Sequence, residues 1–575
     1  MTKPIPVIDL FAGAGGLGEG FSSFHRPDGT PVFRVALSVE CESAAHRTLE
    51  LRAFFREFPQ GRAPDAYYAH LRGEISRDEL WAAHPTEGKA AEATAWRATL
   101  GSPEAPESAI DARISERVLG HEAWVLVGGP PCQAFSMAGR SRNRAKPGYK
   151  PEEDHRHFLY REYLRILNVH KPPVFVMENV KGVLSAKLDS GPIFDRMLDD
   201  LKAPSTAFGD DGPHPGYRIY SLSTKSEQTD LWGGTGLASA DYVVRCEDYG
   251  IPQKRHRVLL LGVRKDIDSL VQPDVLSQPD ACPTVADAIA DLPKLRAAIS
   301  SRPNEKKIDD STDAWLKLLR AALRAPWMKD LKRDGDPARS AKTAVRAVLD
   351  DLVPPAADLG GEFVPDAPVS PSFRPDWFHD PRLGGHCNHS ARSHMPSDFH
   401  RYLWASCFAQ ANKVPIRLRD FPAKLQPKHQ NVQSAMGHDN FSDRFKVQAG
   451  DSPSTTVMSH IAKDGHYYIH YDPAQCRSLT VREAARLQTF PDNYYFCGNR
   501  TEQYVQVGNA VPPLLSNQIA QIVFSLLCRA ELTADGPDVR RSAPAQHEPL
   551  PIVRHAAAGR RSIADAPHGT AVQAA

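Results

Sequence analysis

The stretch around Cys132 combines residue types that suit nucleophilic catalysis. The short apolar run Trp124–Val127 predicts a buried β-strand, and two glycines and two prolines follow it directly before the thiol. The prolines fix φ and stiffen the chain at this point. The loop after the carboxyl end of a parallel strand is where a reactive group meets a bound ligand. Because a thiolate is a strong nucleophile near neutral pH, we predict that Cys132 is catalytic; a buried structural cysteine is the alternative.

A basic segment follows the cysteine loop. Residues 139–146 contain four cations that alternate with small or polar residues. This composition suits a loop that closes over phosphates, and a solvated surface loop is the alternative. We therefore expect Arg140 and Arg142 to contact nucleic acid.

A glycine-rich loop near the start of the chain predicts a cofactor site. Gly13–Gly18 follows the apolar run Pro6–Phe11 and fits the pattern G-x-G-x-x-G. Glu40 ends the next apolar run, where a carboxylate can accept hydrogen bonds from both ribose hydroxyls. NAD and S-adenosylmethionine both contain adenosine, so the loop alone does not choose between them. The alternative is a tight strand-to-helix turn that binds no ligand.

Short apolar runs recur over the first 265 residues, with helix-like periodic segments between several of them, for example His157–Leu167 and Ile193–Leu201. Strands that alternate with helices predict an α/β sheet with ligand sites at the carboxyl ends of its strands. The further predicted strands are residues 33–39, 124–127, 174–177 and 258–263.

The sequence changes character after about Lys265. The following residues are rich in Pro, Arg and His and show no strand-helix rhythm. A good helix at Ser478–Leu487 and an apolar segment at Tyr504–Leu527 come next, and a tail poor in large apolar residues follows, which we expect to be disordered. The predicted parts are residues 1–265, 266–475, 476–530 and 531–575.

Bulk composition excludes several classes of protein. The 575 residues carry a net charge of +1, so any nucleic-acid surface must come from local clustering of Lys and Arg. Nine cysteines in a chain of this length do not form a disulfide scaffold. The first residues of the chain are typical of a β-strand and not of a signal peptide. We expect no apolar run long enough to span a bilayer. A cytoplasmic monomer is expected.

Six segments together resemble the bacterial DNA cytosine-5 methyltransferase family. Pro130–Gln133 resembles its catalytic PPCQ motif, and Val7–Phe21 resembles its cofactor motif DLFAGxGG. The other four matches follow in the order found in the family. They are Met177–Val180 (ENV), Gln253–Arg257 (QxRxR), Arg477–Pro491 (REAxRLQxFP) and Gln506–Pro512 (GNAVP).

The resemblance implies a covalent mechanism on a cytosine that is flipped out of the duplex. Cys132 would attack carbon 6, and Glu178 would hold a proton at ring nitrogen 3. Arg257 would lie near the exocyclic oxygen, with Arg255 supporting the loop and a phosphate; the two alternate on an extended segment, and a salt-bridged surface strand is the alternative. Two DNA-binding candidates beside the nucleophile, which would fill the gap in the duplex or bind a phosphate, are Gln133 and Ser136.

The resemblance also implies S-adenosylmethionine as the cofactor in a Rossmann-like methyltransferase sheet. Phe11 would pack on the adenine, and Glu40 would bind the ribose. Glu74, in a Gly-Glu-Ile sequence similar to the family's GDI after the third strand, would meet the adenine amino group. The other expected cofactor residues are Ala12, Gly13, Gly15, Gly16, Leu17, Pro131, Asn509, Ala510 and Val511.

The large segment between the QxRxR and REAxRLQ motifs corresponds to the family's target-recognition domain, inserted into the sheet domain. It contains His386, Cys387, His389, His394 and Cys407, but no C-x-x-C pair, so we favour polar packing or DNA contact over a zinc site and expect no metal. The expected partners are double-stranded DNA and a restriction endonuclease that acts on the same site.

Three other functions stay open on the sequence. A tRNA cytosine-5 methyltransferase would use the same motifs, although the large insertion favours duplex DNA. An NAD-dependent oxidoreductase would explain the glycine loop and Glu40 but would leave the PPCQ, ENV and QxRxR motifs unused. A non-catalytic DNA-binding relative is disfavoured by the intact Cys132 and Glu178.

Overall fold

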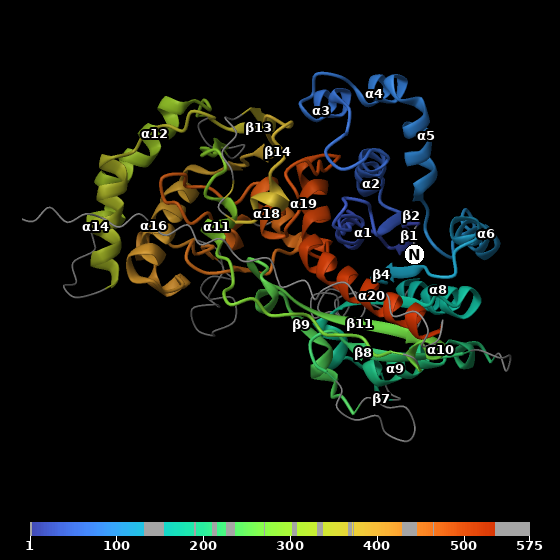
Figure 1. The fold of residues 1–575 in the computed structure, drawn as a ribbon. Helices are drawn as coiled ribbons and strands as arrows, with labels where there is room; N and C mark the ends of the chain where they lie inside the picture. Colours follow the sequence, from blue (N-terminus) through green and yellow to red (C-terminus); the bar gives the residue numbers. More distant parts are fainter. Residues whose placement is uncertain are drawn as a thin grey trace, which may run out of the picture. The chain divides into compact units, whose positions relative to one another are not determined.

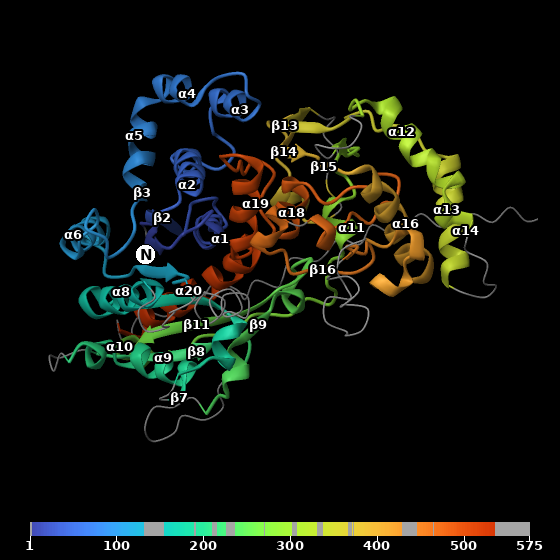
Figure 2. The same ribbon diagram turned by 180° about the vertical axis from the view of Figure 1, so that it is seen from behind.

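The structure is a computed structural model, shown from opposite sides in Figures 1 and 2. The residues up to Ala534 form one compact unit. The predicted boundaries at residues 265 and 475 inside this unit remain predictions. The described residues are 3–131, 155–188, 191–209, 215–225, 236–269, 271–301, 308–329, 337–365, 371, 373–427, 445–463 and 465–534.

A mixed eight-stranded sheet forms the centre of the fold. The strand order is β3-β2-β1-β4-β5-β11-β8, and β9 also pairs with β11. The first five strands in this order are parallel to one another, whereas β11 is antiparallel to its neighbours β5, β8 and β9. The predicted Rossmann-like α/β class is confirmed. The strands are β1 (Ile5–Leu10), β2 (Phe33–Glu40), β3 (Ala95–Arg97), β4 (Val125–Gly128), β5 (Val174–Val180), β8 (Tyr217–Ser221), β9 (Val243–Arg245) and β11 (His256–Arg264).

Helices cover both faces of this sheet. Since successive strand residues point to opposite sides, one strand contributes apolar side chains to both helix layers. Val125 packs in one apolar cluster with Ile519 of helix α20 (Pro513–Ala534), and its neighbour Leu126 packs in another with Leu164 of helix α8 (His155–His170) (Figure 1). Other helices around the sheet are α1 (Gly16–Ser22), α2 (Ser43–Arg56), α6 (Glu107–Val118) and α9 (Ile193–Lys202).

The segment 500–531 is long and apolar enough to cross a membrane by length and composition, so the expectation that no such run exists is wrong. However, 67% of its most apolar window is buried inside the protein. The segment includes α19 (Arg500–Asn509) and most of α20, which packs against α1 and the sheet. The segment therefore belongs to the core of the fold.

An additional helical insertion separates β2 from β3. It contains α3 (Asp65–Leu71), α4 (Arg77–Ala83) and α5 (Pro85–Thr94). The expectation that Glu74 follows the third strand is wrong, because β3 begins only at Ala95 and Glu74 lies in the turn after α3. The Glu74 side chain is 54% exposed and pairs with Arg72 at 2.6 Å.

Helices form most of the regular secondary structure between β11 and helix α18 (Val481–Leu487). Its helices share an apolar cluster that includes Trp315, Val345 and Trp404. A two-stranded antiparallel sheet of β13 (Gly360–Pro365) and β14 (Gly385–Ser390) lies in the same part. The main helical elements are α12 (Thr312–Arg320), the 3-10 helix η6 (Ala321–Arg324), α13 (Pro326–Lys329), α14 (Pro337–Asp350) and α16 (Pro396–Asn412).

Candidate active site

The carboxyl ends of β1, β4 and β5 lie in one row at the edge of the sheet. Gly128 is opposite Leu10 of β1 on one side and opposite Met177 of β5 on the other. Neighbouring strands lie about 4.8 Å apart. The glycine loop after Leu10, the Gly-Gly-Pro-Pro loop and Glu178 therefore start side by side, although they are far apart in the sequence.

The glycine loop wraps around the Glu40 carboxylate. Phe11, Gly13 and Gly15 have φ values of 56°, 57° and 76°, the left-handed region that favours glycine. This turn allows the Gly13 N–H to donate to Glu40 Oε2 at 2.8 Å, while the Glu42 N–H donates to Glu40 Oε1 at 2.8 Å. Glu40 Oε1 also accepts from the Cys41 thiol at 3.5 Å, whereas Oε2 keeps a further lone pair for a ligand hydroxyl. The structure therefore fixes Glu40 at the mouth of the loop.

The C-terminal GNAVP segment closes against the same loop. A Cβ atom on Gly16 would lie 2.1 Å from the Val511 carbonyl oxygen, so only glycine fits at this contact. The Tyr494 hydroxyl donates to the Ala14 carbonyl. Asn509 is exposed next to this contact, whereas Ala510 and Val511 are buried. The fold thus brings the glycine loop next to the GNAVP segment through Gly16 and Val511, and their role in binding a cofactor stays a prediction.

Glu178 and Arg257 form an ion pair between adjacent strands. Arg257 Nε lies 2.8 Å from Glu178 Oε1, and each side chain is 14% exposed. A Cβ atom on Gly129 would lie 2.9 Å from Glu178 Oε2, so the backbone that leads to the cysteine passes directly over the carboxylate. The pair can therefore present a carboxyl group and a guanidinium to one small polar ligand beside the cysteine loop.

Arg255 is placed differently from Arg257. It is 1% exposed, and its amino groups donate to the Val457 carbonyl at 2.8 Å and the Gly508 carbonyl at 3.2 Å. Burial, with the nearby Arg257 charge, lowers the pKa of Arg255 to about 9. The two arginines do not alternate on one strand, because β11 begins only at His256. Arg255 instead joins the strand to the segments before α18 and at the end of α19.

Several of the predicted residues lie outside the described residues. These are Cys132, Gln133, Ser136, Arg140 and Arg142. The described chain ends before them at Pro131, which is half-buried at the same edge of the sheet.

Comparison with known proteins decides the family. Residues 103–204, 237–347 and 392–525, more than half of the chain, match the family model of the C-5 cytosine-specific DNA methylases. The chain belongs to this family. Type II methyltransferase M.Bpa9945I of Bacillus paralicheniformis is 31% identical over 91% of this chain and 99% of the relative.

Two further relatives are more distant. Type II methyltransferase M.AgeI of Thalassovita gelatinovora is 27% identical over 90% of this chain and 98% of its own length. DNA (cytosine-5-)-methyltransferase M.ApeKI of Aeropyrum pernix is 26% identical over 71% of this chain and 82% of its own length. Together with the family match, these relatives show that the chain is a DNA (cytosine-5-)-methyltransferase.

Gln253 joins three segments of the methyltransferase and was missed as a site residue in the sequence. Its side-chain amide donates to the Leu487 carbonyl at 3.1 Å and to Gln488 Oε1 at 3.0 Å. Its side-chain oxygen accepts from the Val457 N–H at 2.7 Å. Gln253 is the first residue of the QxRxR motif, and Gln488 is the last residue of the REAxRLQ motif. Their membership of these two motifs was the sequence signal that could have identified Gln253.

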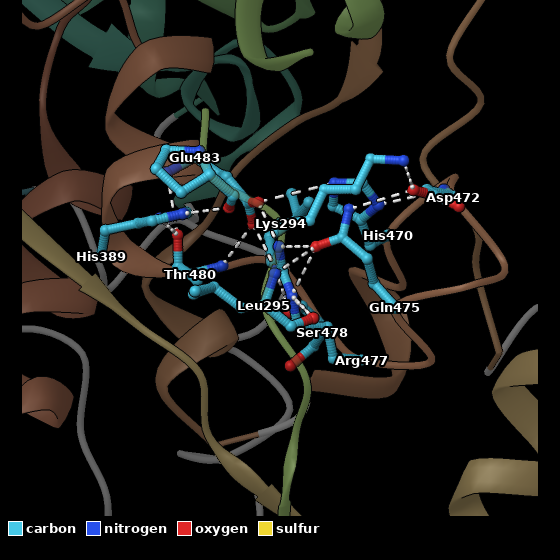
Figure 3. A network of polar contacts seen from close by, with 12 residues as sticks. Lys294, Leu295, His389, His470, Asp472, Gln475, Arg477, Ser478, Thr480 and Glu483 are labelled. Carbon is cyan, nitrogen blue, oxygen red and sulfur yellow. Dashed lines mark hydrogen bonds and ion pairs between the residues drawn. The ribbon is translucent and has the colours of Figure 1, made fainter. Parts of the chain in front are cut away.

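A buried ionic network lies at the N-terminal end of the REAxRLQ helix of the methyltransferase (Figure 3). Arg477 donates to both Glu483 oxygens at 2.6 and 2.7 Å, and the Thr480 N–H donates to Glu483 Oε2 at 2.7 Å. His470 Nε2 lies 3.5 Å from the same carboxylate. Although burial opposes ionisation, Arg477 and His470 hold the pKa of Glu483 far below its ordinary value. The network fixes the N-terminus of α18.

The histidines and cysteines considered for zinc are engaged in packing. His389 bonds to Thr480 Oγ1 at 2.9 Å and to the Pro293 carbonyl at 2.8 Å, and burial lowers its pKa to about 3. Cys387 is buried in a cluster with Leu71 and Leu383. Within the ranges that the structure describes, no group of three or more His, Cys, Asp or Glu could hold a metal ion.

Proposed function

We propose that the enzyme methylates carbon 5 of a flipped-out cytosine through a transient bond between Cys132 Sγ and carbon 6. The Glu178–Arg257 pair, 2.8 Å apart at the sheet edge where the cysteine loop begins, is the observation that carries this proposal. Addition of the thiolate converts the ring into an enamine and pushes negative charge toward nitrogen 3. Splitting one difficult transfer into two easier steps is the benefit of covalent catalysis.

Each member of the pair has a separate task in this mechanism. Glu178 holds a proton at nitrogen 3, and Arg257 donates to the exocyclic oxygen, so the charge that develops on the ring meets a donor on both sides. After carbon 5 has gained the methyl group, its proton leaves to solvent and the thiolate is expelled. The aromatic ring is restored and Cys132 is returned.

The glycine loop fits S-adenosylmethionine, which supplies a methyl group on a positively charged sulfur. Glu40 is fixed by two backbone N–H donors, and its Oε2 atom keeps a lone pair for a ribose hydroxyl; a second hydroxyl would replace the weak Cys41 thiol donor on Oε1. Phe11, at the carboxyl end of β1, is half-buried and can pack on the adenine. The proposed cofactor site also includes Ala12, Leu17, Pro131 and Asn509.

A trapping experiment tests the nucleophile. A duplex with 5-fluorocytosine at the methylated position blocks proton loss from carbon 5, so the wild-type enzyme with S-adenosylmethionine should form a denaturant-resistant complex. The Cys132→Ser variant should form none and should lose turnover while keeping the wild-type unfolding curve. A fluorocytosine adduct mapped to another residue, or substantial methyl transfer by Cys132→Ser, would overturn the proposal.

The substrate is tested with unmethylated duplex DNA and tRNA in parallel. We expect tritiated methyl transfer to the duplex only; transfer to tRNA alone would favour the rival function. Sequencing of methylated cytosines in host DNA after expression gives the target site.

We also propose that this modification protects cytoplasmic DNA against a cognate restriction endonuclease. The relatives M.Bpa9945I and M.AgeI are named as type II methyltransferases, which supports this role. DNA from cells that express the enzyme should resist cleavage by an endonuclease with the same target, and equal cleavage with and without expression would contradict the role.

A further inference from the structure

The helices α12 to α14 concentrate positive charge in a chain that is nearly neutral. The whole chain has a net charge of +1. The described residues 312–329 and 337–350 contain seven Lys or Arg and the two acidic residues Asp313 and Asp350, and three further carboxylates, Asp309, Asp310 and Asp351, lie directly beside them in the sequence. Such local clustering is the electrostatic signature of a surface that meets a polyanion.

The cations of α12 and η6 lie on the side opposite to the core. Lys317, Arg320 and Arg324 follow the spacing i, i+3, i+7, which places them along one helix face. All three are exposed, whereas Trp315 and Leu319 of the same helix are fully buried. The helix therefore uses its apolar face for packing and presents a basic face to solvent.

Helix α14 continues this arrangement. Ala341, Val345 and Leu349 are buried, and α14 packs against α16 through this face. Lys342 and Arg346 lie on the flank of the same helix, with Arg346 exposed. In both views, α12 and α14 follow one another along one edge, and α16 lies on their inner side (Figures 1 and 2).

Among the described residues, internal ion pairs do not account for six of these seven cations, and the seventh, Arg339, has an interaction of its own. Within the described part of the chain, no acidic side chain pairs with any member of the set Lys317, Arg320, Arg324, Lys329, Lys342 and Arg346. Arginines elsewhere in this part of the chain behave differently. Arg296 pairs with Asp310 at 2.6 Å and also with Asp358, and Arg401 pairs with Asp398 at 2.8 Å.

We propose that this basic face binds the sugar-phosphate backbone of the duplex that flanks the methylated site. Lys and Arg contacts to phosphates add affinity and orientation without reading sequence. From Lys317 to Arg324 the helix axis advances about 10 Å, so the face spans two or three phosphates of one strand. The choice of DNA as the polyanion rests on the proposed function; the basic face itself does not.

The test compares a neutralised face with a matched control. The variant Lys317→Gln/Arg320→Gln/Arg324→Gln removes three exposed cations, and Arg47→Gln/Arg62→Gln/Lys89→Gln removes three exposed cations from α2 and the α3–α5 insertion. Binding is measured by fluorescence anisotropy with labelled random-sequence duplexes of about 40 and about 14 base pairs, at several salt concentrations.

The face variant should bind the longer duplex about ten-fold more weakly, and the slope of log affinity against log salt should fall by about 2 to 3. The control variant should keep the wild-type slope and the wild-type turnover number on plasmid DNA, and both variants should keep the wild-type unfolding curve. An unchanged affinity and slope in the face variant, or equal losses in both variants, overturns the proposal. If wild-type protein binds the duplexes but transfers no methyl group to DNA, the proposed function fails while the basic face is still tested.

Discussion

Asn493 donates a hydrogen bond to Asp380 Oδ2 at 2.7 Å and so links the cofactor side of the enzyme to the inserted region. The Asn493 side-chain oxygen accepts from Arg52 at 2.9 Å, and Arg52 is paired with Glu19 of α1. Tyr68 donates to the same Asp380 oxygen at 2.7 Å. One carboxylate thus connects α1, α2, the α3–α5 insertion and the region that precedes β14.

Asp380→Ala should destabilise the enzyme, because it leaves the Asn493 amide and the Tyr68 hydroxyl without their acceptor. The loss of two partly buried bonds should cost about 2 to 3 kcal/mol in the free energy of unfolding, measured by urea denaturation. Asp376→Ala is the matched control, since Asp376 is 55% exposed and pairs with Arg374 on the surface. Equal effects of the two substitutions would show that the connection through Asp380 is unimportant.

Asp9 should make stability depend on pH. Its carboxyl is buried on β1 against Gly18. Burial, opposed by the Arg56 charge, raises its pKa to about 7 from an ordinary value of 3.8. The unfolded chain therefore loses this proton at lower pH than the native enzyme, and stability falls as pH rises from about 4 to about 7. Asp9→Asn should remove this loss.

The Asp9→Asn variant should be more stable than wild type at pH 8 by about 2 to 4 kcal/mol and nearly equal to it at pH 4.5. Urea midpoints at the two pH values measure the difference. If the substitution destabilised the enzyme equally at both pH values, the raised pKa would not be the controlling factor.

Gly16→Ala should separate the cofactor loop from the C-terminal segment. The added methyl group would lie 2.1 Å from the Val511 carbonyl oxygen, which is backbone and must move. We expect S-adenosylmethionine affinity, measured by calorimetry, to fall at least about ten-fold, with about 2 kcal/mol lost in stability. Gly361→Ala is the control for a milder crowding of backbone, because its added methyl group would lie 3.3 Å from the Phe363 carbonyl oxygen and only a small shift would relieve the contact. Wild-type cofactor affinity in Gly16→Ala would exclude this contact as part of the site.

Local patterns in the sequence predicted most of the sheet and its loops. Each predicted apolar run, such as residues 174–177, overlaps a strand of the sheet. A strand that is buried on both faces needs a continuous apolar stretch, which made these strands recognisable. β3 was missed because Ala95–Arg97 is only three residues long and follows three inserted helices. The apolar positions 341, 345 and 349 did carry the signal for α14, at helical spacing.

Contacts between distant polar residues could not be predicted in the same way. Nothing near Asn493 in the sequence indicates Asp380 as its partner, and nothing near Arg255 indicates the Gly508 carbonyl. These pairs form only after the inserted region and the C-terminal segment have packed against the sheet, so their distances depend on the whole fold. The motif residues Glu178 and Arg257 were found because the family resemblance quoted both, and the structure brings them together.

Substitutions in the Glu178–Arg257 pair should lower kcat without weakening cofactor binding. Glu178→Gln keeps the size of the side chain but cannot supply an acidic proton to nitrogen 3, so kcat should fall by about 100-fold or more. Arg257→Ala removes the donor to the exocyclic oxygen and should have an effect of similar size. Cofactor affinity should stay within about two-fold of wild type in both variants, because the Glu40 carboxylate is held by different partners, the Gly13 and Glu42 N–H groups.

The two substitutions should not be additive. If both side chains stabilise charge on the same ring, the double variant should be little slower than either single variant, which single-turnover methylation of duplex DNA would measure. The control is Arg264→Ala on the same strand, whose side chain pairs with Asp266 away from the strand's pairing with Glu178. A fully multiplicative loss in the double variant would show that Glu178 and Arg257 act on separate steps, and it would remove the reason for assigning both to one bound cytosine.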